Sequence, residues 1–128
     1  MKIVPDMVGL VVADLPAAAR FYRMLGLDFP DVAAGEPYVE CKVNGYRISL
    51  NAVSLDKELT PDWVAPQGQR LGLAFLCESP KHVDDTYAAV VAAGHKGVKA
   101  PWDAFWGQRY AIVEDPDGAH VSIFCPLS

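Results

Sequence analysis

The sequence predicts an α+β fold built from two copies of one module, each a strand, a helix and a small group of strands. The order of strand and helix signals recurs in the second half of the chain, and in each half a capping residue precedes the helix and a glycine follows it. Residues 45–50 (GYRISL) also align with residues 118–123 (GAHVSI). Because one such module is too small to bury its own sheet face, we expect the two sheets to close around a shared cavity.

The first half opens with an apolar, β-branched strand at residues 7–12. Asp14 is a good N-cap, apolar side chains at helical spacing predict a helix over residues 16–25, and Gly26 ends it.

A hairpin is predicted next. The dipeptide Asn44-Gly45 tolerates the positive φ angles of a tight turn, and it predicts strands at residues 38–43 and 46–53. Residues 54–69 hold prolines and a glycine without a sustained period, so they are predicted to be a connecting loop.

The second half repeats this order. Ser79 is the predicted N-cap, Pro80 suits the first helical position, and Gly94 ends a helix over residues 83–93. Residues 97–107 are aromatic and are predicted to be irregular. Strands are predicted at residues 71–77, 108–113 and 119–124, and a turn at 115–118.

Length and composition are typical of one compact globular domain, with 128 residues, 52% hydrophobic and 21% charged. The net charge of −5 at pH 7 would repel a phosphate backbone, which argues against nucleic acid as a partner. The sequence shows neither a run of about 20 apolar residues nor a signal peptide, so we expect a cytoplasmic protein without membrane contact. The three cysteines contain no Cys-x-x-Cys pair and are expected to be buried, reduced thiols.

Several short segments, in this order, resemble one family: residues 7–15 (MVGLVVADL), 21–22 (FY), 25–26 (LG), 106–107 (WG) and 115–118 (DPDG). The sequence resembles the vicinal oxygen chelate superfamily, which contains glyoxalases, extradiol dioxygenases, fosfomycin-resistance enzymes and bleomycin-resistance binding proteins. The resemblance implies a single domain in which two βαβββ modules form a cupped eight-stranded mixed sheet around a cavity. The domain would span residues 1–128, with module 1 at about 1–53, the connecting loop at 54–69 and module 2 at about 70–128.

Enzymes of this superfamily hold a divalent metal between the two sheets, with ligands from the first and last strands of each module. The resemblance puts these positions on Met7 and Ser49 in module 1, and on Gly72 (or Arg70, in a register slipped by two) and Ser122 in module 2. Such metals bind imidazole and carboxylate donors, whereas a thioether, two hydroxyls and a glycine offer almost no affinity. We therefore expect no metal, no cofactor and no catalytic residue.

Polar and aromatic side chains are the remaining candidates for a ligand site. Arg47 and Ser49 share one side of a predicted strand, and His120 and Ser122 share one side of another. An indole face suits a flat or cationic ligand. The predicted ligand-binding residues are Arg47, Ser49, Trp102, Phe105, Trp106, Tyr110, His120 and Ser122. Three alternatives stay open: the rings cover a sheet end or a dimer contact, Arg47 lies on a solvent-facing rim, and His120 is only a polar wall residue.

The preferred function is a metal-independent binding protein of the bleomycin-resistance type, a homodimer that binds an aromatic or cationic, antibiotic-like small molecule without transforming it. One alternative is a metal-dependent lyase, isomerase or dioxygenase with ligands at unusual positions, for which His120 and Glu40 are the first candidates. Another is a structural or regulatory dimer without a ligand.

Overall fold

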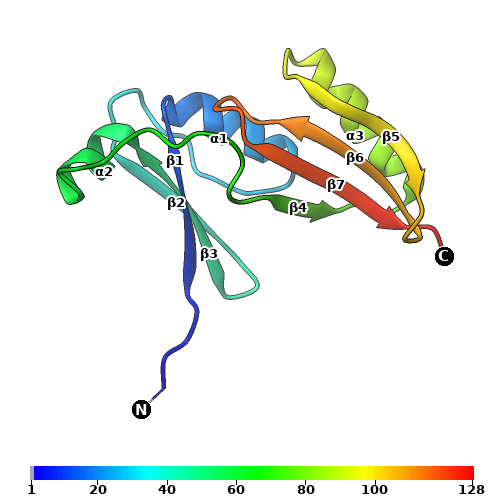
Figure 1. The fold of residues 1–128 in the computed structure, drawn as a ribbon, viewed down its shortest axis with the longest axis horizontal. Helices are drawn as coiled ribbons and strands as arrows, with labels where there is room; N and C mark the ends of the chain where they lie inside the picture. Colours follow the sequence, from blue (N-terminus) through cyan, green and yellow to red (C-terminus); the bar gives the residue numbers. More distant parts are fainter. Residues whose placement is uncertain (1) are drawn as a thin grey trace. The chain divides into compact units, whose positions relative to one another are not determined.

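The computed structural model describes residues 2–128 and divides the chain into two compact units, one up to Pro66 and one from Gln67 onward (Figure 1). The first unit contains β1 (Met7–Val12), α1 (Leu15–Met24), β2 (Tyr38–Val43), β3 (Tyr46–Ala52) and α2 (Val53–Leu59). The second contains β4 (Leu73–Leu76), α3 (Pro80–Ala92), β5 (Gly97–Ala104), β6 (Gln108–Glu114) and β7 (His120–Pro126). The division falls inside the segment that the sequence predicts as the connection between modules.

Each unit has its own sheet. Sheet A has the order β1-β3-β2, with β1 parallel and β2 antiparallel to β3. Sheet B has the order β4-β7-β6-β5, with β4 parallel to β7 and antiparallel pairs from β7 through β6 to β5. In both sheets the first strand of the unit pairs in parallel with the last. The α+β class and the repeated order of elements are therefore confirmed.

The number of strands differs from the prediction, because residues 2–128 form seven strands, three in sheet A and four in sheet B, instead of eight. Residues 28–37, which connect α1 to β2, are irregular and form no strand. Pro30, within this segment, lacks the N–H that a strand ladder uses. In addition, Arg23 Nε donates to the Phe29 carbonyl at 3.0 Å and Arg23 Nη2 donates to the Pro30 carbonyl at 3.3 Å. Carbonyl groups that a further strand would need are already bonded.

In two other segments the secondary structure differs from the sequence prediction. Residues 53–59 form α2 where a loop is predicted, because the prolines and the glycine of this stretch lie beyond the helix, at residues 61–68. Residues 97–104 form β5 where irregular chain is predicted. Strand β5 pairs with β6 through two register shifts, and Pro101 lies within the second of them. The aromatic residues and the proline of this segment interrupt the alternation of apolar and polar residues by which a strand is predicted.

The predicted capping residues act as caps. Asp14 Oδ1 accepts the Ala17 N–H at the start of α1, and Ser79 Oγ accepts the His82 N–H at the start of α3, both at 3.0 Å. The predicted tight turn is also present, with φ of +52° at Asn44 and +83° at the following glycine.

The core of the first unit lies between α1 and one face of sheet A. Phe21 and Tyr22 of α1 are buried, with their ring centroids 4.9 Å apart, and Val12 and Leu50 of the sheet are buried as well. Because strand side chains alternate, the other face of sheet A carries a different set of residues. This second face, which we call the polar face, carries Met7, Gly9 and Val11 of β1, Tyr38, Glu40 and Lys42 of β2, and Arg47, Ser49 and Asn51 of β3.

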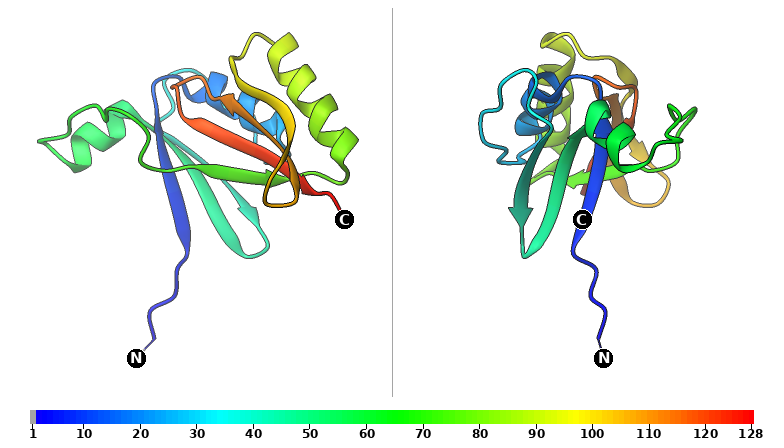
Figure 2. Two further views of the ribbon diagram at one scale, coloured as in Figure 1. Left: turned by 45° about the vertical axis from the view of Figure 1, so that its right-hand side comes forward. Right: turned by 90° about the vertical axis from the view of Figure 1, so that its left-hand side faces the viewer.

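In the second unit α3 covers one face of sheet B (Figure 2). The fully buried side chains here are Val83 and Val90 of α3 and Ala111, Val113, Val121 and Ile123 of the sheet. Gly97 belongs to this face, where the Tyr87 ring of α3 leaves no space for a Cβ. The opposite face, which we call the aromatic face, carries Ala74 and Leu76 of β4, Lys99, Trp102 and Ala104 of β5, Gln108, Tyr110, Ile112 and Glu114 of β6, and His120, Ser122 and Phe124 of β7.

The helices within residues 2–128 are too short or too polar to cross a lipid bilayer.

Candidate functional site

Aromatic rings crowd one end of the aromatic face, next to the β5–β6 turn. Trp102 and Tyr110 lie opposite each other on β5 and β6, with ring centroids 5.4 Å apart. Trp106, in the turn, packs edge-on against both, at 6.0 Å from Trp102 and 5.3 Å from Tyr110. Phe105 packs edge-on against Trp106 at 5.0 Å, and Phe124 of β7 stacks on Tyr110 at 6.1 Å with 26° between the planes. We call Trp102, Phe105, Trp106, Tyr110 and Phe124 the aromatic cluster.

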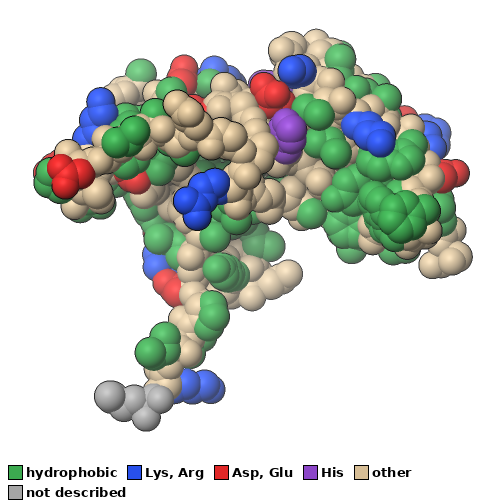
Figure 3. All heavy atoms as spheres, in the orientation of Figure 1, with side chains coloured by type: hydrophobic (Ala, Val, Ile, Leu, Met, Phe, Trp, Pro, Cys, Tyr) green, Lys and Arg blue, Asp and Glu red, His purple; other side chains and the backbone are tan. Residues whose placement is uncertain are grey.

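The cluster is open to solvent. Phe105 is 97% exposed and Trp106 is 48% exposed, whereas Trp102, Tyr110 and Phe124 are partly buried. Figure 3 shows hydrophobic side chains gathered on the surface of the second unit, with Lys or Arg side chains beside them. Scattered exposed apolar residues are ordinary, but a contiguous exposed patch marks an interaction site.

One cation belongs to this face. Lys99 lies opposite Ile112, and Trp102 lies opposite Tyr110, so the second register shift of β5, which lies between them, puts Lys99 and Trp102 on the same side of the sheet. The Lys99 ammonium lies 4.1 Å from the centroid of the Trp102 ring, within the range of a cation–π interaction. The Trp106 indole N–H donates to Gln108 Oε1 at 2.8 Å, which fixes the orientation of this ring.

Of the predicted site residues, Trp102, Phe105, Trp106, Tyr110, His120 and Ser122 lie in the second unit, around the aromatic face. His120 and Ser122 are half-buried and share their side of β7 with Phe124. The His120 backbone N–H donates to Gln69 Oε1 at 2.9 Å, which ties the start of β7 to the segment before β4. Across the strands, His120 pairs with Glu114, at the opposite end of β6 from the rings.

The polar face of sheet A carries Arg47, and its groups bond to one another. Arg47 donates to Glu40 at 3.0 Å and to Asp6. Glu40 also accepts the Tyr38 hydroxyl at 3.1 Å. The hydrogen bond and charge of Asp6, followed by the charge of Glu40, raise the pKa of Arg47. The guanidinium is therefore held by two carboxylates within its own unit.

The Ser49 side chain has no exposed surface. Its hydroxyl donates to Asn51 Oδ1 at 2.8 Å, and the Asn51 amide donates in turn to Asp56 of α2 at 3.3 Å. A Cβ at Gly9, on the neighbouring strand, would lie 3.0 Å from the Ser49 hydroxyl, so this part of the face is closely packed. Ser49 therefore acts within its sheet in this structure.

The residues at the metal-ligand positions of the resembled family do not fit a divalent metal. Met7 Sδ accepts the Tyr38 hydroxyl at 3.2 Å, Ser49 is bonded to Asn51, and Gly72 offers no side chain. Within residues 2–128, no group of three or more His, Cys, Asp or Glu side chains is placed to hold a metal ion. These donors supply neither the imidazole nor the carboxylate set that such a metal needs.

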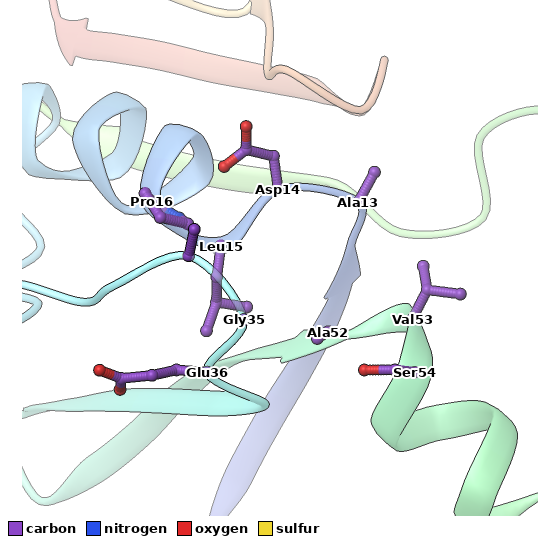
Figure 4. Close-up of a pocket in the computed structure, with 10 residues that line it drawn as sticks. Ala13, Asp14, Leu15, Pro16, Gly35, Glu36, Ala52, Val53 and Ser54 are labelled. Atoms are coloured by element: carbon purple, nitrogen blue, oxygen red, sulfur yellow. The ribbon is translucent and has the colours of Figure 1, made fainter.

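The first unit also contains a cavity of about 350 Å³, at the end of sheet A where β1 leads into α1 and β3 leads into α2 (Figure 4). Its lining includes Ala13 to Pro16, 34–36 and 52–54. Both acidic groups are already bonded to backbone N–H groups, Asp14 to Ala17 and Glu36 to Ala33 at 3.2 Å. The cavity is formed by chain connections and has few polar groups left to orient a ligand.

The thiols are not placed for nucleophilic chemistry. Cys41, Cys77 and Cys125 are buried and unpaired by disulfides, as the sequence predicts. Burial raises the pKa of Cys41 and of Cys77, so neither is activated as a thiolate. The predicted turn at 115–118 is confirmed as well, since Asp115 Oδ1 accepts the N–H groups of Asp117 and Ala119 at 2.9 and 2.8 Å.

Comparison with known proteins identifies the family. The model of the Glyoxalase/Bleomycin resistance protein/Dioxygenase superfamily matches residues 4–123. The chain belongs to this superfamily. As a glyoxalase-superfamily protein, it has the two-part architecture that the sequence repeat predicts, which explains why β1 and β4 have equivalent pairings in the two sheets.

Solved structures support the same fold. A glyoxalase/bleomycin resistance protein/dioxygenase family enzyme from Burkholderia phytofirmans is 22% identical, with a TM-score of 0.82 over 95% of this chain and 98% of that chain. A similar protein from Nocardioides is 25% identical, with a TM-score of 0.75 over 100% and 86% of the two chains. A lactoylglutathione lyase from Agrobacterium tumefaciens is 19% identical, with a TM-score of 0.69 over 98% and 95%. None of the curated proteins matches this glyoxalase-superfamily chain.

Sequence reasoning missed two residues of the site. Phe124 shares the strand alternation of His120 and Ser122, so the same pattern could have found it. Lys99 could not be found in this way, because its place beside Trp102 depends on the register shifts of β5.

Proposed function

We propose that this glyoxalase-superfamily protein is a metal-independent binding protein of the bleomycin-resistance type, which binds a small aromatic molecule on the aromatic face of sheet B without transforming it. The observation that carries the proposal is the aromatic cluster, in which five rings pack in edge or stacked contact while Phe105 and Trp106 stay largely exposed. Binding sites for small molecules are mostly apolar, with a few polar groups that fix orientation.

The energetics favour a flat ligand. An aromatic pair contributes about 0.5–1.5 kcal/mol beyond its buried area, and burying a large apolar group contributes about 1.5–3 kcal/mol. A ligand ring placed against Trp106 and Tyr110 would cover surface that water now contacts. Affinity can therefore arise without a metal.

The proposal rests on the second unit. Arg47 and Ser49, also predicted from the sequence, are engaged within sheet A, Arg47 with Asp6 and Glu40 and Ser49 with Asn51. Glu40, the candidate ligand for a metal-dependent enzyme, is bonded to Arg47 and Tyr38. These contacts support binding over metal chemistry.

The test uses the three tryptophans, Trp63, Trp102 and Trp106. In a Trp63→Phe background, fluorescence reports only on the aromatic cluster, and we titrate it with a panel of polycyclic and cationic aromatic compounds. Trp106→Ala is expected to weaken binding by about tenfold or more, since about 1.4 kcal/mol corresponds to a factor of ten. Trp63→Phe alone is the matched control and is expected to bind as the wild type does.

Two results would contradict the proposal. One is a ligand that binds the wild type and every tryptophan variant equally well, because the cluster would then be a packing feature. The other is binding that disappears after chelation and returns with a divalent metal. The predicted homodimer is checked by sedimentation of the same samples.

A further inference from the structure

A charged side chain of the aromatic face, that of Lys99, contacts a ring of the aromatic cluster. Lys99 reaches over Trp102, with its ammonium 4.1 Å from the ring centroid. The nearby carboxylate of Asp103 lies opposite Arg109 on the face toward α3, where Arg109 binds both Asp103 at 3.2 Å and Asp84 at 3.0 Å. That acid is neutralised on the other side of the sheet.

A carboxylate and an imidazole of the aromatic face lie at the far end of β6 from the rings. Glu114 and His120 form the cross-strand pair at the opposite end of β6 from Gln108. Glu114 lies four positions along β6 from Tyr110, which is roughly 13 Å at about 3.3 Å per residue. Glu114 is also 3.9 Å from the Lys96 ammonium. The charged side chain in contact with the rings is therefore a cation, although the whole chain carries a net charge of −5.

A cationic ligand meets two obstacles here. The ring face of Trp102 that would attract a cation already holds Lys99. A second cation at the cluster would also lie close to the Lys99 ammonium, and like charges repel. A carboxylate on the ligand gains a charge-assisted hydrogen bond from the same ammonium.

We infer that the ligand of the aromatic face is a planar aromatic carboxylate, with its ring against Trp106 and Tyr110 and its carboxylate at Lys99. This inference rests on the proposed function and specifies its ligand. The ring supplies most of the affinity, and Lys99 selects the sign of the charge. Lys99 is thus a specificity-determining residue.

The test compares three probes with one ring system: 2-naphthoate, 2-naphthylmethanol and 2-naphthylmethylammonium. Calorimetric titration of the full chain is expected to rank them in that order of affinity. Lys99→Met keeps the length of the side chain without its charge, and it is expected to lower the affinity for 2-naphthoate by about two- to fivefold, as for an exposed ion pair. Binding of 2-naphthylmethanol should stay unchanged, and Lys99→Glu should favour the ammonium probe.

Lys96→Met is the matched control, because it removes the same charge from a lysine that faces Glu114 instead of the rings. It is expected to leave the order of the probes unchanged. Thermal unfolding of each variant checks that it folds.

The outcomes separate the inference from the proposed function. If 2-naphthylmethylammonium binds the wild type more tightly than 2-naphthoate, or if Lys99→Met and Lys96→Met act alike, the inference is wrong and the binding function stands. If all three probes fail to bind the wild type, both are wrong. Sedimentation then shows whether a second copy of the chain covers the cluster instead.

Discussion

The two sheets have equivalent first and last strands, yet the faces turned away from their long helices differ in chemistry. The polar face of sheet A holds Arg47 between Glu40 and Asp6 and a buried Ser49. The aromatic face of sheet B holds packed rings and a single lysine beside Trp102. In each sheet the opposite face is apolar, and the long helix of the unit packs on it.

The difference shows which properties follow from topology and which from individual residues. Strand pairing decides that Ser49 and Ser122 occupy matching positions, each on the last strand of its unit and on the face away from the long helix. The neighbours then decide their states: Ser49 is closed in beside Gly9 and Asn51, whereas Ser122 stays half-exposed beside Phe124. A repeated fold therefore gives two corresponding faces, and their residues make one of them polar and the other aromatic.

The largest expected effect separates the two faces of one strand. Ile123 is fully buried against α3, and Phe124, the next residue, belongs to the aromatic cluster. Ile123→Ala is expected to lower the free energy of unfolding by about 2–5 kcal/mol, because it leaves a cavity in the core. Phe124→Ala should lower the free energy of unfolding by less, but it should weaken the binding of aromatic ligands. Urea unfolding and ligand titration of both variants check this, and equal losses of stability would contradict the assignment of faces.

A smaller effect compares the two units where they are alike. Asp14 and Ser79 each accept a backbone N–H in the first turn of their helix at 3.0 Å. Asp14→Ala and Ser79→Ala are each expected to lower the free energy of unfolding by about 1 kcal/mol, without changing ligand affinity. Thermal unfolding measures the cost. Asp14→Asn and Ser79→Thr, which keep a capping oxygen, serve as controls, and a loss as large in these variants would argue against capping as the cause.

The smallest effect is a pH dependence shared by the two units. Burial raises the pKa of Cys41 in the first unit and of Cys77 in the second, so the folded chain holds these protons more tightly than the unfolded chain. Stability is therefore complete below the ordinary thiol pKa of about 8.5 and falls as the pH rises above it. Urea midpoints between neutral and alkaline pH measure the fall. A fall of the same size in Cys41→Ala and Cys77→Ala as in the wild type would show that other groups cause it.

Local sequence signals predicted most of the fold. The caps at Asp14 and Ser79 and the Asn44-Gly45 turn were identifiable because a side chain or a backbone angle acts within a few residues. The strand at 97–104 was not, because Pro101 and the aromatic residues disturb its alternation and only pairing with β6 defines it.

The candidate site follows the same division. Trp102, Trp106 and Tyr110 were predictable as a group because they are close in sequence. The bonding of Arg47 to Asp6 depends on residues 41 positions apart, and the place of Lys99 depends on irregular pairing. Single-sequence patterns contain neither kind of information.

The irregular pairing of β5 has an evolutionary consequence. Lys99 and Trp102 are three positions apart, a spacing that in a regular strand puts two side chains on opposite faces. They share a face only because β5 holds an extra residue between them relative to β6. A one-codon deletion between them would restore the regular ladder and still leave the ammonium on the face of the rings, because residues two positions apart in a regular strand share a face. The pairing of the lysine with the rings could thus survive the loss of a codon in a lineage, without any substitution among the aromatic residues.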